Sequence, residues 1–249
     1  MNLQGKTALV TGGSGVLGGR ICIALADAGV NLAIGYAKNP DKAAAVAEEM
    51  RAKGVRAIPV ACDVTDLEQV RSAIAATVKE FGGVHILVND GAFNKAVDFT
   101  DIDGLTYELW DKIIDINLSG PMRTIKEVVE PMRASGGGRI VNISSVAGLG
   151  PNGSSIAYAV SKAGLNHLTK CMARGLAPDI LVNCVAPGYL EGTLMSSNLT
   201  PEHRKTAVAG AILQKAADKD DIARQVVEFC RSDTTTGQTL VIDSGRVFH

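Results

Sequence analysis

The chain has 249 residues, 46% hydrophobic and with 27 glycines, which fits a large packed α/β domain and excludes a disordered or fibrous protein. Its formal net charge of -1, without a long basic run, excludes the electrostatic footprint of a nucleic-acid-binding protein. The five cysteines are scattered and the four histidines lack metal spacing, so we expect reduced thiols and no metal site. The amino terminus lacks a signal-peptide layout and no segment has the ~20 apolar residues of a membrane helix, so we expect a soluble cytoplasmic protein.

Apolar runs of strand length alternate along the chain with longer segments of helical period. The runs are TALVTG, NLAIGY, RAIPVACDV, HILVND, RIVNISS, ILVNCVAPG and TLVIDS. Their near-continuous apolar character is typical of strands buried on both faces of a parallel sheet. The alternation predicts one domain over 1–249, a doubly wound, Rossmann-type parallel sheet of about seven strands with helices on both faces. Such sheets bind ligands at the carboxyl ends of their strands.

Several helices have recognisable start signals. The segment 39–41 (NPD) supplies a cap, a proline for the first helical position and an acid for the helix dipole. Thr65 and Glu68 predict a capping box ahead of LEQVRSAIAATVKEF. The pair 200–201 (TP) repeats the cap-then-proline pattern before PEHRKTAVAGAIL. These signals set the expected beginnings of three helices.

A glycine-rich turn, TGGSGVLGG, joins the first strand to the first helix. Glycine permits positive φ and lets backbone N–H groups approach a pyrophosphate, and the helix N-terminus adds a partial positive charge. The position of the turn indicates a dinucleotide-binding loop. The residues expected to contact the dinucleotide here are Gly12, Ser14, Gly15, Val16 and Leu17.

The end of the second strand bears on which dinucleotide binds. An acid there would hold the ribose hydroxyls of NAD, but residues 35–39 read GYAKN and the first acid, Asp41, already serves the helix dipole. Lys38 can pair with a 2′-phosphate, which favours NADP, or can be a solvated loop lysine. Asp63, which ends the third strand, is placed to accept a hydrogen bond from an adenine amine or to cap its own loop.

Tyr158 and Lys162 lie four residues apart in YAVSK, on one face of a predicted helix. A free phenol, with a pKa of ~10, is a poor base at neutral pH. A neighbouring ammonium is expected to lower that pKa and make the phenol useful in acid–base catalysis. Ser145 lies thirteen residues ahead of Tyr158, at the end of a predicted strand.

Together these motifs make the sequence similar to the short-chain dehydrogenase/reductase family over nearly its whole length. The glycine turn, CDVTD, LVND, INLSG, NISS, YAVSK, VAPG and TGQTL occur in the order and spacing of that family. The length resembles the compact branch of the family, typified by 3-oxoacyl-carrier-protein reductases and sugar or polyol dehydrogenases. Because most family members are tetramers, the resemblance also implies a homotetramer.

The resemblance implies roles for four residues. Tyr158 would protonate the carbonyl oxygen during reduction and act as the base in the reverse direction. Lys162 would lower the pKa of the phenol and bind the nicotinamide ribose. Ser145 would orient the substrate carbonyl, and Asn117, in INLSG, would hold a water that links the lysine to solvent. The nicotinamide cofactor would supply the hydride.

The family pattern also implies cofactor contacts beyond the first turn. They follow the second, third, fourth and sixth predicted strands or belong to the catalytic helix. These residues are Lys38, Asp63, Val64, Asn89, Gly91, Tyr158, Lys162, Pro187, Gly188, Leu190 and Thr193.

Near the expected cofactor site the sequence departs from the family pattern at three residues. Val16 replaces the middle glycine of TGxxxGxG and requires φ < 0, so we expect a different loop path. Asp90 replaces an asparagine of NNAG and brings a charge to the cofactor cleft, which is expected to weaken cofactor binding unless it is solvated or paired. Thr193 comes one residue later than usual.

The substrate pocket is expected between Phe93–Thr106 and Leu190–Lys215, with a lid within about 190–215 that excludes water on closing. We favour reduction of a ketone or a 3-oxoacyl thioester with NADPH. Arg133, Arg139 and Arg174 are candidates for meeting a phosphopantetheine carrier at the entrance.

Two alternatives stay open. A sugar or polyol dehydrogenase would read hydroxyls through polar side chains near the pocket, namely Asn94, Lys95, Asn152, Ser154 and Ser155. A nicotinamide-sensing protein without catalysis would keep the cofactor site and have no need of Tyr158 as an acid.

Overall fold

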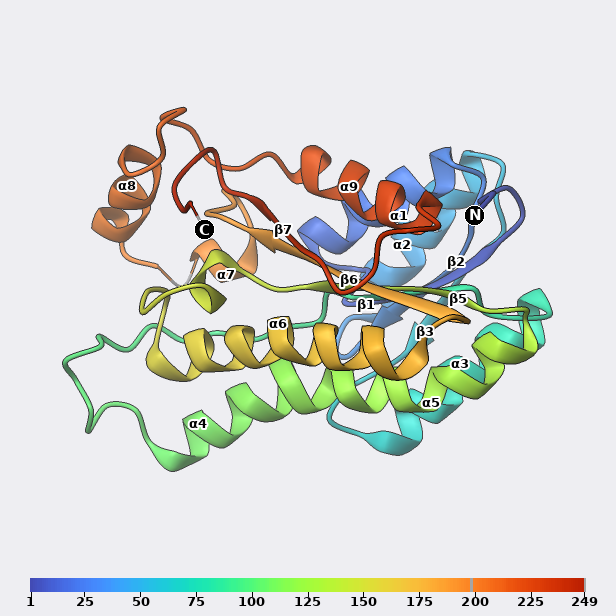
Figure 1. Ribbon diagram of the computed structural model, residues 1–249, viewed down its shortest axis with the longest axis horizontal. Coiled ribbons are helices and arrows are strands. Elements are labelled where there is room, and N and C mark those ends of the chain that lie inside the picture. The colour runs from blue at the N-terminus through green and yellow to red at the C-terminus, as the bar shows by residue number, and fades with distance from the viewer. Residues whose placement is uncertain (198, 249) are drawn as a thin grey trace.

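A seven-stranded parallel sheet forms the centre of the molecule (Figure 1). The computed structural model describes residues 1–197 and 199–248, without the side chain of residue 203. Its strands are β1 (Thr7–Thr11), β2 (Asn31–Tyr36), β3 (Ala57–Ala61), β4 (Ile86–Asn89), β5 (Gly138–Ile143), β6 (Ile180–Pro187) and β7 (Thr239–Ile242). Their spatial order is β3-β2-β1-β4-β5-β6-β7, and every neighbouring pair is parallel. The predicted doubly wound sheet is confirmed, and its order reverses between β1 and β4, where such sheets bind ligands.

Helices cover both faces of the sheet. On the upper face in Figure 1 lie α1 (Val16–Asp27), α2 (Pro40–Ala52) and α9 (Lys219–Arg231). The other face carries α3 (Leu67–Phe81), α4 (Tyr107–Ile114), α5 (Gly120–Ala134) and α6 (Ile156–Leu176). A separate cluster of buried apolar side chains fills each interface. Strands β1, β4 and β5 are therefore buried along their whole length, which explains their continuous apolar sequence.

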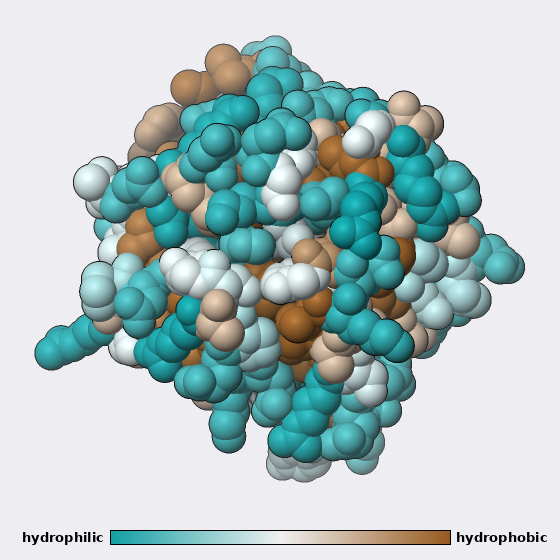
Figure 2. Space-filling view, turned by 90° about the vertical axis from the view of Figure 1, so that its right-hand side faces the viewer, coloured by the Kyte–Doolittle hydropathy of each residue, from teal (hydrophilic) through white to brown (hydrophobic). Residues whose placement is uncertain are grey.

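The parallel strands share a carboxyl edge, at the left of Figure 1, and an amino edge, at the right. Two short helices, α7 (Leu194–Ser197) and α8 (Pro201–Ala209), project from the carboxyl edge between β6 and α9. They occupy the expected lid range 190–215, within which residue 198 lies outside the described residues. Figure 2 views the amino edge, where hydrophilic residues surround small apolar patches. None of the helices in the described part of the chain is long and apolar enough to cross a membrane.

The start signals hold for α2 but not for α3. Asn39 caps α2 by accepting a hydrogen bond from the N–H of Lys42 at 3.0 Å, as predicted. The capping box before α3 is wrong: Asp66 is the N-cap, and its carboxylate accepts from the N–H groups of Glu68 and Gln69 at 3.0 and 3.2 Å. A carboxylate at this position also gains from the helix dipole, so it displaces the neighbouring hydroxyl of Thr65.

A π-helical turn, Asp115–Ser119, joins α4 to α5 in one continuous run of helix. Such turns insert an extra residue into the helical ladder and often occur at functional sites. At its end, a Cβ on Gly120 would lie 2.6 Å from Val64 Cγ2, so glycine is needed where the helix crosses the loop after β3. The turn carries Asn117, one of the residues expected in the site.

Candidate functional site

Most of the sequence-predicted site residues lie at the carboxyl edge. The ends of β1, β4, β5 and β6 are neighbours in the sheet, so the loops that follow them meet there. Helix α6 begins at this edge because it returns antiparallel to the strands, and its first turns bring in Tyr158 and Lys162. The chain thus assembles residues from five separate segments around one point.

The glycine turn after β1 is held in close backbone contact with its surroundings. Gly12 has φ +66°, and a Cβ there would lie 2.9 Å from Gly91 Cα. The N–H of Gly13 donates to the carbonyl of Gly35 at 3.0 Å. Val16 is the first residue of α1 and takes the helical conformation, so the missing glycine of the family pattern causes no backbone strain.

This turn fits a dinucleotide phosphate. Gly15 is the N-cap of α1 and has no side chain to satisfy the first N–H groups of the helix, and the first turn of α1 contains no acid. The N–H groups of Val16 and Leu17 therefore remain for an anionic ligand. Asp90 follows β4 near this turn, and an interaction with the Gly18 N–H acts to lower the pKa of its carboxyl group.

The residues expected at the adenosine side have different surroundings. Lys38 lies exposed beyond the end of β2. One oxygen of Asp63 accepts from the N–H and the hydroxyl of Thr65, at 3.0 and 2.7 Å, so it caps its own loop, as one of the two alternatives had it. Val64 is buried, and its carbonyl accepts from Arg123 at 3.1 Å, which makes it a packing residue as much as a lining one.

A buried hydrogen-bond network fixes the end of β4. The Asn89 amide donates to Asn142 at 2.9 Å and accepts from the Thr124 hydroxyl at 2.7 Å. Asn142 in turn donates to Thr169 of α6 at 2.9 Å. The side chain of Asn89 is thus used inside the protein, where it ties β4, β5 and α5 together. The N–H of Gly91 donates to the Thr11 hydroxyl at 3.2 Å, which anchors the following loop.

Ser145 and Tyr158 face each other across the site. Ser145 caps the turn after β5, and its hydroxyl accepts from the N–H of Ala147 at 3.2 Å; its interaction with the Tyr158 hydroxyl acts to lower the pKa of that phenol. Ser155, the N-cap of α6, accepts from the N–H of Tyr158 and fixes where the helix begins. The neighbouring Ser144 donates instead to the carbonyl of Lys162 at 3.1 Å, so it is structural.

Lys162 lies beneath this pair. Its side chain is 3% exposed, and Nζ donates to the carbonyl of Ile143 at 2.9 Å and lies 5.8 Å from the centre of the Tyr158 ring. Burial lowers the pKa of Lys162 to about 8, although the charges of Cys184 and Asp90 oppose this. The lysine therefore sits close to its own deprotonation at neutral pH.

The expected depression of the Tyr158 pKa is wrong for this arrangement. Burial raises the pKa of Tyr158 to about 12, the hydrogen bond from Ser145 opposes the shift, and the charge of Asp90 adds to it. Burial likewise raises the pKa of Asp90 to about 7, against the attraction of Lys162 and the Gly18 N–H. Desolvation is the largest cause of the rise at Tyr158, because taking the phenolate out of water costs free energy.

Asn117 joins the loop after β4 to α6. Its side-chain oxygen accepts from the N–H of Phe93 at 2.8 Å, and its amide nitrogen donates to the Phe93 carbonyl at 2.9 Å and to Ser161 Oγ at 3.1 Å. Both N–H bonds of the amide are used in this way. A relay water would therefore be held by an oxygen of Asn117 and not by its nitrogen.

The loop after β6 closes the remaining side. A Cβ on Gly188 would lie 2.7 Å from Asp243 Cα, so the loop passes directly over the end of β7. The Thr193 hydroxyl accepts from the N–H of Ser196 at 3.1 Å and donates to the Leu190 carbonyl at 3.2 Å. Thr193 thus caps α7, and a contact with a cofactor would compete with these bonds.

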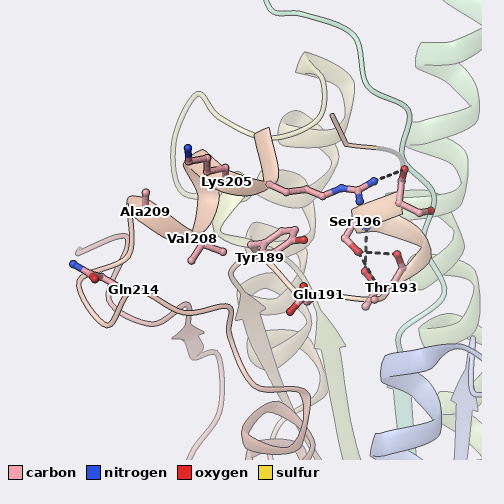
Figure 3. Close-up of a pocket in the computed structure, with 11 residues that line it drawn as sticks. Tyr189, Glu191, Thr193, Ser196, Lys205, Val208, Ala209 and Gln214 are labelled. Carbon is pink, nitrogen blue, oxygen red and sulfur yellow. Dashed lines mark hydrogen bonds between the residues drawn. The ribbon is translucent and has the colours of Figure 1, made fainter. Parts of the chain in front are cut away.

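A cavity of about 720 Å³ lies between this loop and α8 (Figure 3). The Tyr189 ring lies near its centre, with Lys205 and Val208 of α8 on one side and Glu191 on the other. The two expected pocket walls touch each other outside the lining of this cavity, since the Asn94 side chain donates to the Met195 carbonyl at 3.2 Å. Tyr189 was not among the predicted site residues. In the sequence it lies between Gly188 and Leu190, which were predicted to flank the nicotinamide, and this position could have identified it.

The arginines predicted for a carrier at the entrance lie at the opposite edge. Arg139 is the second residue of β5, and Arg133 and Arg174 lie in the last turns of helices that end at the amino edge. Arg139 is also buried and paired with Asp233 at 2.6 Å. The spacing of residues along the chain could not reveal on which edge of the sheet these arginines lie. That edge depends on the direction in which each strand or helix runs.

Comparison with known proteins agrees with this geometry. The model of the short chain dehydrogenase family matches residues 6–204. The 3-oxoacyl-[acyl-carrier-protein] reductase of Staphylococcus epidermidis is 36% identical over 248 residues, covering 96% of this chain and 98% of the relative. A short-chain type dehydrogenase/reductase from Mycobacterium marinum superposes with a TM-score of 0.88 at 30% identity, covering 99% and 96% of the two chains. An NADPH-dependent 3-quinuclidinone reductase from Rhodotorula rubra gives 0.90 at 25% identity, covering 98% and 92%.

The family match spans most of the chain, and the relatives align over nearly their full length. The glycine turn, Ser145, Tyr158 and the buried Lys162 occupy one edge of the sheet. The chain belongs to the short-chain dehydrogenase/reductase family of oxidoreductases.

Proposed function

We propose that the protein reduces a ketone or a 3-oxoacyl thioester with NADPH. The observation that carries this proposal is the gathering of Ser145, Tyr158 and the buried Lys162 at one edge of the sheet, at which the glycine turn also lies. The relative from Staphylococcus epidermidis is named a 3-oxoacyl-[acyl-carrier-protein] reductase, and the structure from Rhodotorula rubra is named an NADPH-dependent 3-quinuclidinone reductase. Both names support reduction as the direction.

The protonation states fit a proton donor. With a pKa of about 12, the Tyr158 phenol keeps its proton at neutral pH and can donate it to a carbonyl oxygen. The Ser145 hydroxyl would hold that oxygen within reach of the phenol. Lys162 and an oxygen of Asn117 would return a proton from solvent to the phenolate. A nicotinamide dinucleotide bound along the glycine turn would supply the hydride.

The preference for NADPH rests on the end of β2. Lys38 is exposed there, and the acid nearest in sequence, Asp41, lies in the first turn of α2, where it interacts with the helix dipole. A 2′-phosphate beside Lys38 would gain an ion pair, whereas the ribose hydroxyls of NAD would find no carboxylate at the strand end. Lys38→Ala should therefore weaken NADPH binding more than NADH binding.

The surroundings of the cavity favour an apolar or acyl substrate. Leu194, Ile212 and Leu213 are 70%, 69% and 60% exposed around α7 and α8, so apolar surface is available beside the cavity. The amide of Asn94 is already bonded to the Met195 carbonyl, which reduces the polar groups that a sugar would need. Exposed Met122 and Val160 on α5 and α6 fit the homo-oligomer implied by the family, which stays a prediction.

The test follows the loss of nicotinamide absorbance with NADPH and with NADH against acetoacetyl thioester, simple ketones and sugars. We expect turnover of the thioester or a ketone with NADPH, lost in Tyr158→Phe and kept in the control Tyr107→Phe, whose side chain is 87% exposed. Turnover of sugars alone would point to the polyol dehydrogenase. Tight cofactor binding without any turnover, unchanged by Tyr158→Phe, would point to the sensor.

A further inference from the structure

Asp243 folds the chain into a tight turn directly after β7. Asp243 is 7% exposed, and its two carboxylate oxygens accept hydrogen bonds from the N–H groups of Gly245 and Val247, at 2.9 and 2.7 Å. Hydrogen bonds to a carboxylate are stronger than those between neutral groups. The turn depends on this support, because Ser244 inside it has φ +60°, a conformation that is unfavourable for residues other than glycine.

This turn is bonded to the exit of the lid. The Ser244 carbonyl accepts from the Leu213 N–H at 3.1 Å, and its hydroxyl donates to the Ala216 carbonyl at 3.2 Å. The next carbonyl, of Gly245, accepts from the Ile212 N–H at 3.2 Å. Figure 1 shows this part of the chain, in red, at the carboxyl edge beside α8. Three hydrogen bonds therefore fix the residues with which the lid ends.

The same turn lies against the loop that leads into the lid. A Cβ on Gly188 would lie 2.7 Å from Asp243 Cα, and the Gly188 N–H donates to the carbonyl of Ile242 at 2.8 Å. The carbonyl of Tyr189 accepts from the N–H of Ala217 at 2.9 Å, so entry and exit are also bonded to each other. Both ends of the lid thus meet at Asp243, and Tyr189, near the centre of the cavity, belongs to this junction (Figure 3).

Between these two ends the lid has few contacts with the core. Among the side chains of α8 that the structure describes, only that of Ala207 is buried. The preceding helix, α7, is bonded to the loop after β4 through the Asn94 amide and the Met195 carbonyl. A segment with so little buried surface opens at a low cost in free energy, so its position depends on the points at which it is attached.

We propose that Asp243 is a positioning residue for the lid: through its turn it joins the two ends of the segment 190–215, so that α8 closes over the cavity about one fixed base. The part that concerns the substrate rests on the proposed function. A lid with a fixed base presents the same wall each time it closes. A loosened base lets the lid settle in several positions, and only a fraction of them bind the substrate.

Asp243→Asn tests this role. The amide keeps one oxygen that can accept an N–H, but its NH2 group faces the other N–H, so one of the two bonds is lost. Asp66→Asn is the control, because it removes the same charge from a carboxylate that also accepts from two backbone N–H groups, at the start of α3 on the other face of the sheet.

Hydrogen exchange followed by mass spectrometry reports directly on the base of the lid. The N–H groups of Ile212, Leu213 and Ala217 exchange when the exit separates from its partners. In Asp243→Asn we expect about tenfold faster exchange at these residues, since the loss of one bond to a carboxylate is worth at least ~1.4 kcal/mol, a factor of ten. Exchange in β1 and β5 should stay as in the wild type, and Asp66→Asn should leave both regions unchanged.

Two results would overturn the proposal. One is unchanged exchange over 212–217 in Asp243→Asn. The other is an equal acceleration in β1 and β5, which would mean that the whole fold is destabilised. If Asp243→Asn does not fold, Ser244→Ala removes only the bond to the Ala216 carbonyl and should speed exchange over 212–217 about two- to tenfold, with no acceleration counting against the proposal.

The second test is the steady-state kinetics of NADPH-dependent reduction of acetoacetyl thioester. In Asp243→Asn the KM for the thioester should rise about three- to tenfold with kcat largely kept, because fewer lid positions bind it. A merely structural role would lower the amount of active enzyme, and so kcat, at unchanged KM, and that result would overturn the proposal. Exchange needs no cofactor and no turnover, so the two proposals fail separately. Accelerated exchange without any NADPH-dependent turnover sinks the proposed function, whereas turnover with unaltered exchange sinks the role of Asp243.

Discussion

Two adjacent glycines of α1 offer a sharp test of the glycine turn. A Cβ on Gly18 would lie 2.9 Å from the carbonyl carbon of Gly12 and from Gly13 Cα, and would overlap the Gly12 carbonyl oxygen. The same Cβ on Gly19 would find its nearest neighbour, the Gly13 carbonyl oxygen, at 4.0 Å. Both residues lie inside the helix, so the local effect of Gly→Ala is the same for each.

The magnitudes follow from these contacts. Gly19→Ala should raise the free energy of unfolding by ~1 kcal/mol, because alanine is the better helix former. Gly18→Ala gains the same amount but must push back the backbone of the turn, at a cost of ~1–3 kcal/mol or more. The two variants should differ by about 2 kcal/mol, roughly 4–8 °C in Tm for a chain of this size.

Thermal unfolding followed by circular dichroism measures the difference, and quenching of tryptophan fluorescence measures NADPH binding. We expect Gly18→Ala to lose most of its NADPH affinity, because the turn that would meet the phosphate has moved, and Gly19→Ala to keep it. Equal stability and equal NADPH affinity of the two variants would refute the close packing of the turn. Loss of binding in both would instead place a phosphate contact at residue 19.

Two further predictions concern the interior and the thiols. Thr124→Val should lower the free energy of unfolding by about 1–3 kcal/mol in urea titration, because it leaves the buried oxygen of Asn89 without its donor at 2.7 Å; an unchanged midpoint would argue against that bond. Of the five cysteines, Cys171 is exposed and the other four are buried, so a thiol reagent should label the native protein once and fail with Cys171→Ser. Rapid labelling of a second thiol would contradict the burial of the others.

The sheet could be predicted because parallel strands buried on both faces leave an apolar signal that depends on local sequence alone. Motif spacing likewise located Ser145, Tyr158 and Lys162, which the structure brings to one edge. The cap of α3 was missed because Thr65 and Asp66 are both good caps, and only the loop geometry selects the second. The predictions for the position of the three arginines and for the direction of the Tyr158 pKa shift were wrong. Both properties depend on the surroundings that the fold creates. Asp90 could be recognised as a departure from the family pattern, but the burial that raises the pKa of its carboxyl group depends on the fold and leaves no pattern in the sequence.

The π-helical turn also changes the direction in which the side chains of a long helix point, so that its two halves face different neighbours. On one side of it, α4 packs against α6; on the other, α5 packs against α3. A regular helix advances 100° per residue, so removing the extra residue of the turn would rotate the apolar face of α5 by about that angle away from α3. The residue expected to serve the proton path therefore belongs to the turn that keeps two halves of a helix facing different partners. Loss of that turn would therefore disturb the packing of the helix and the placement of Asn117 together.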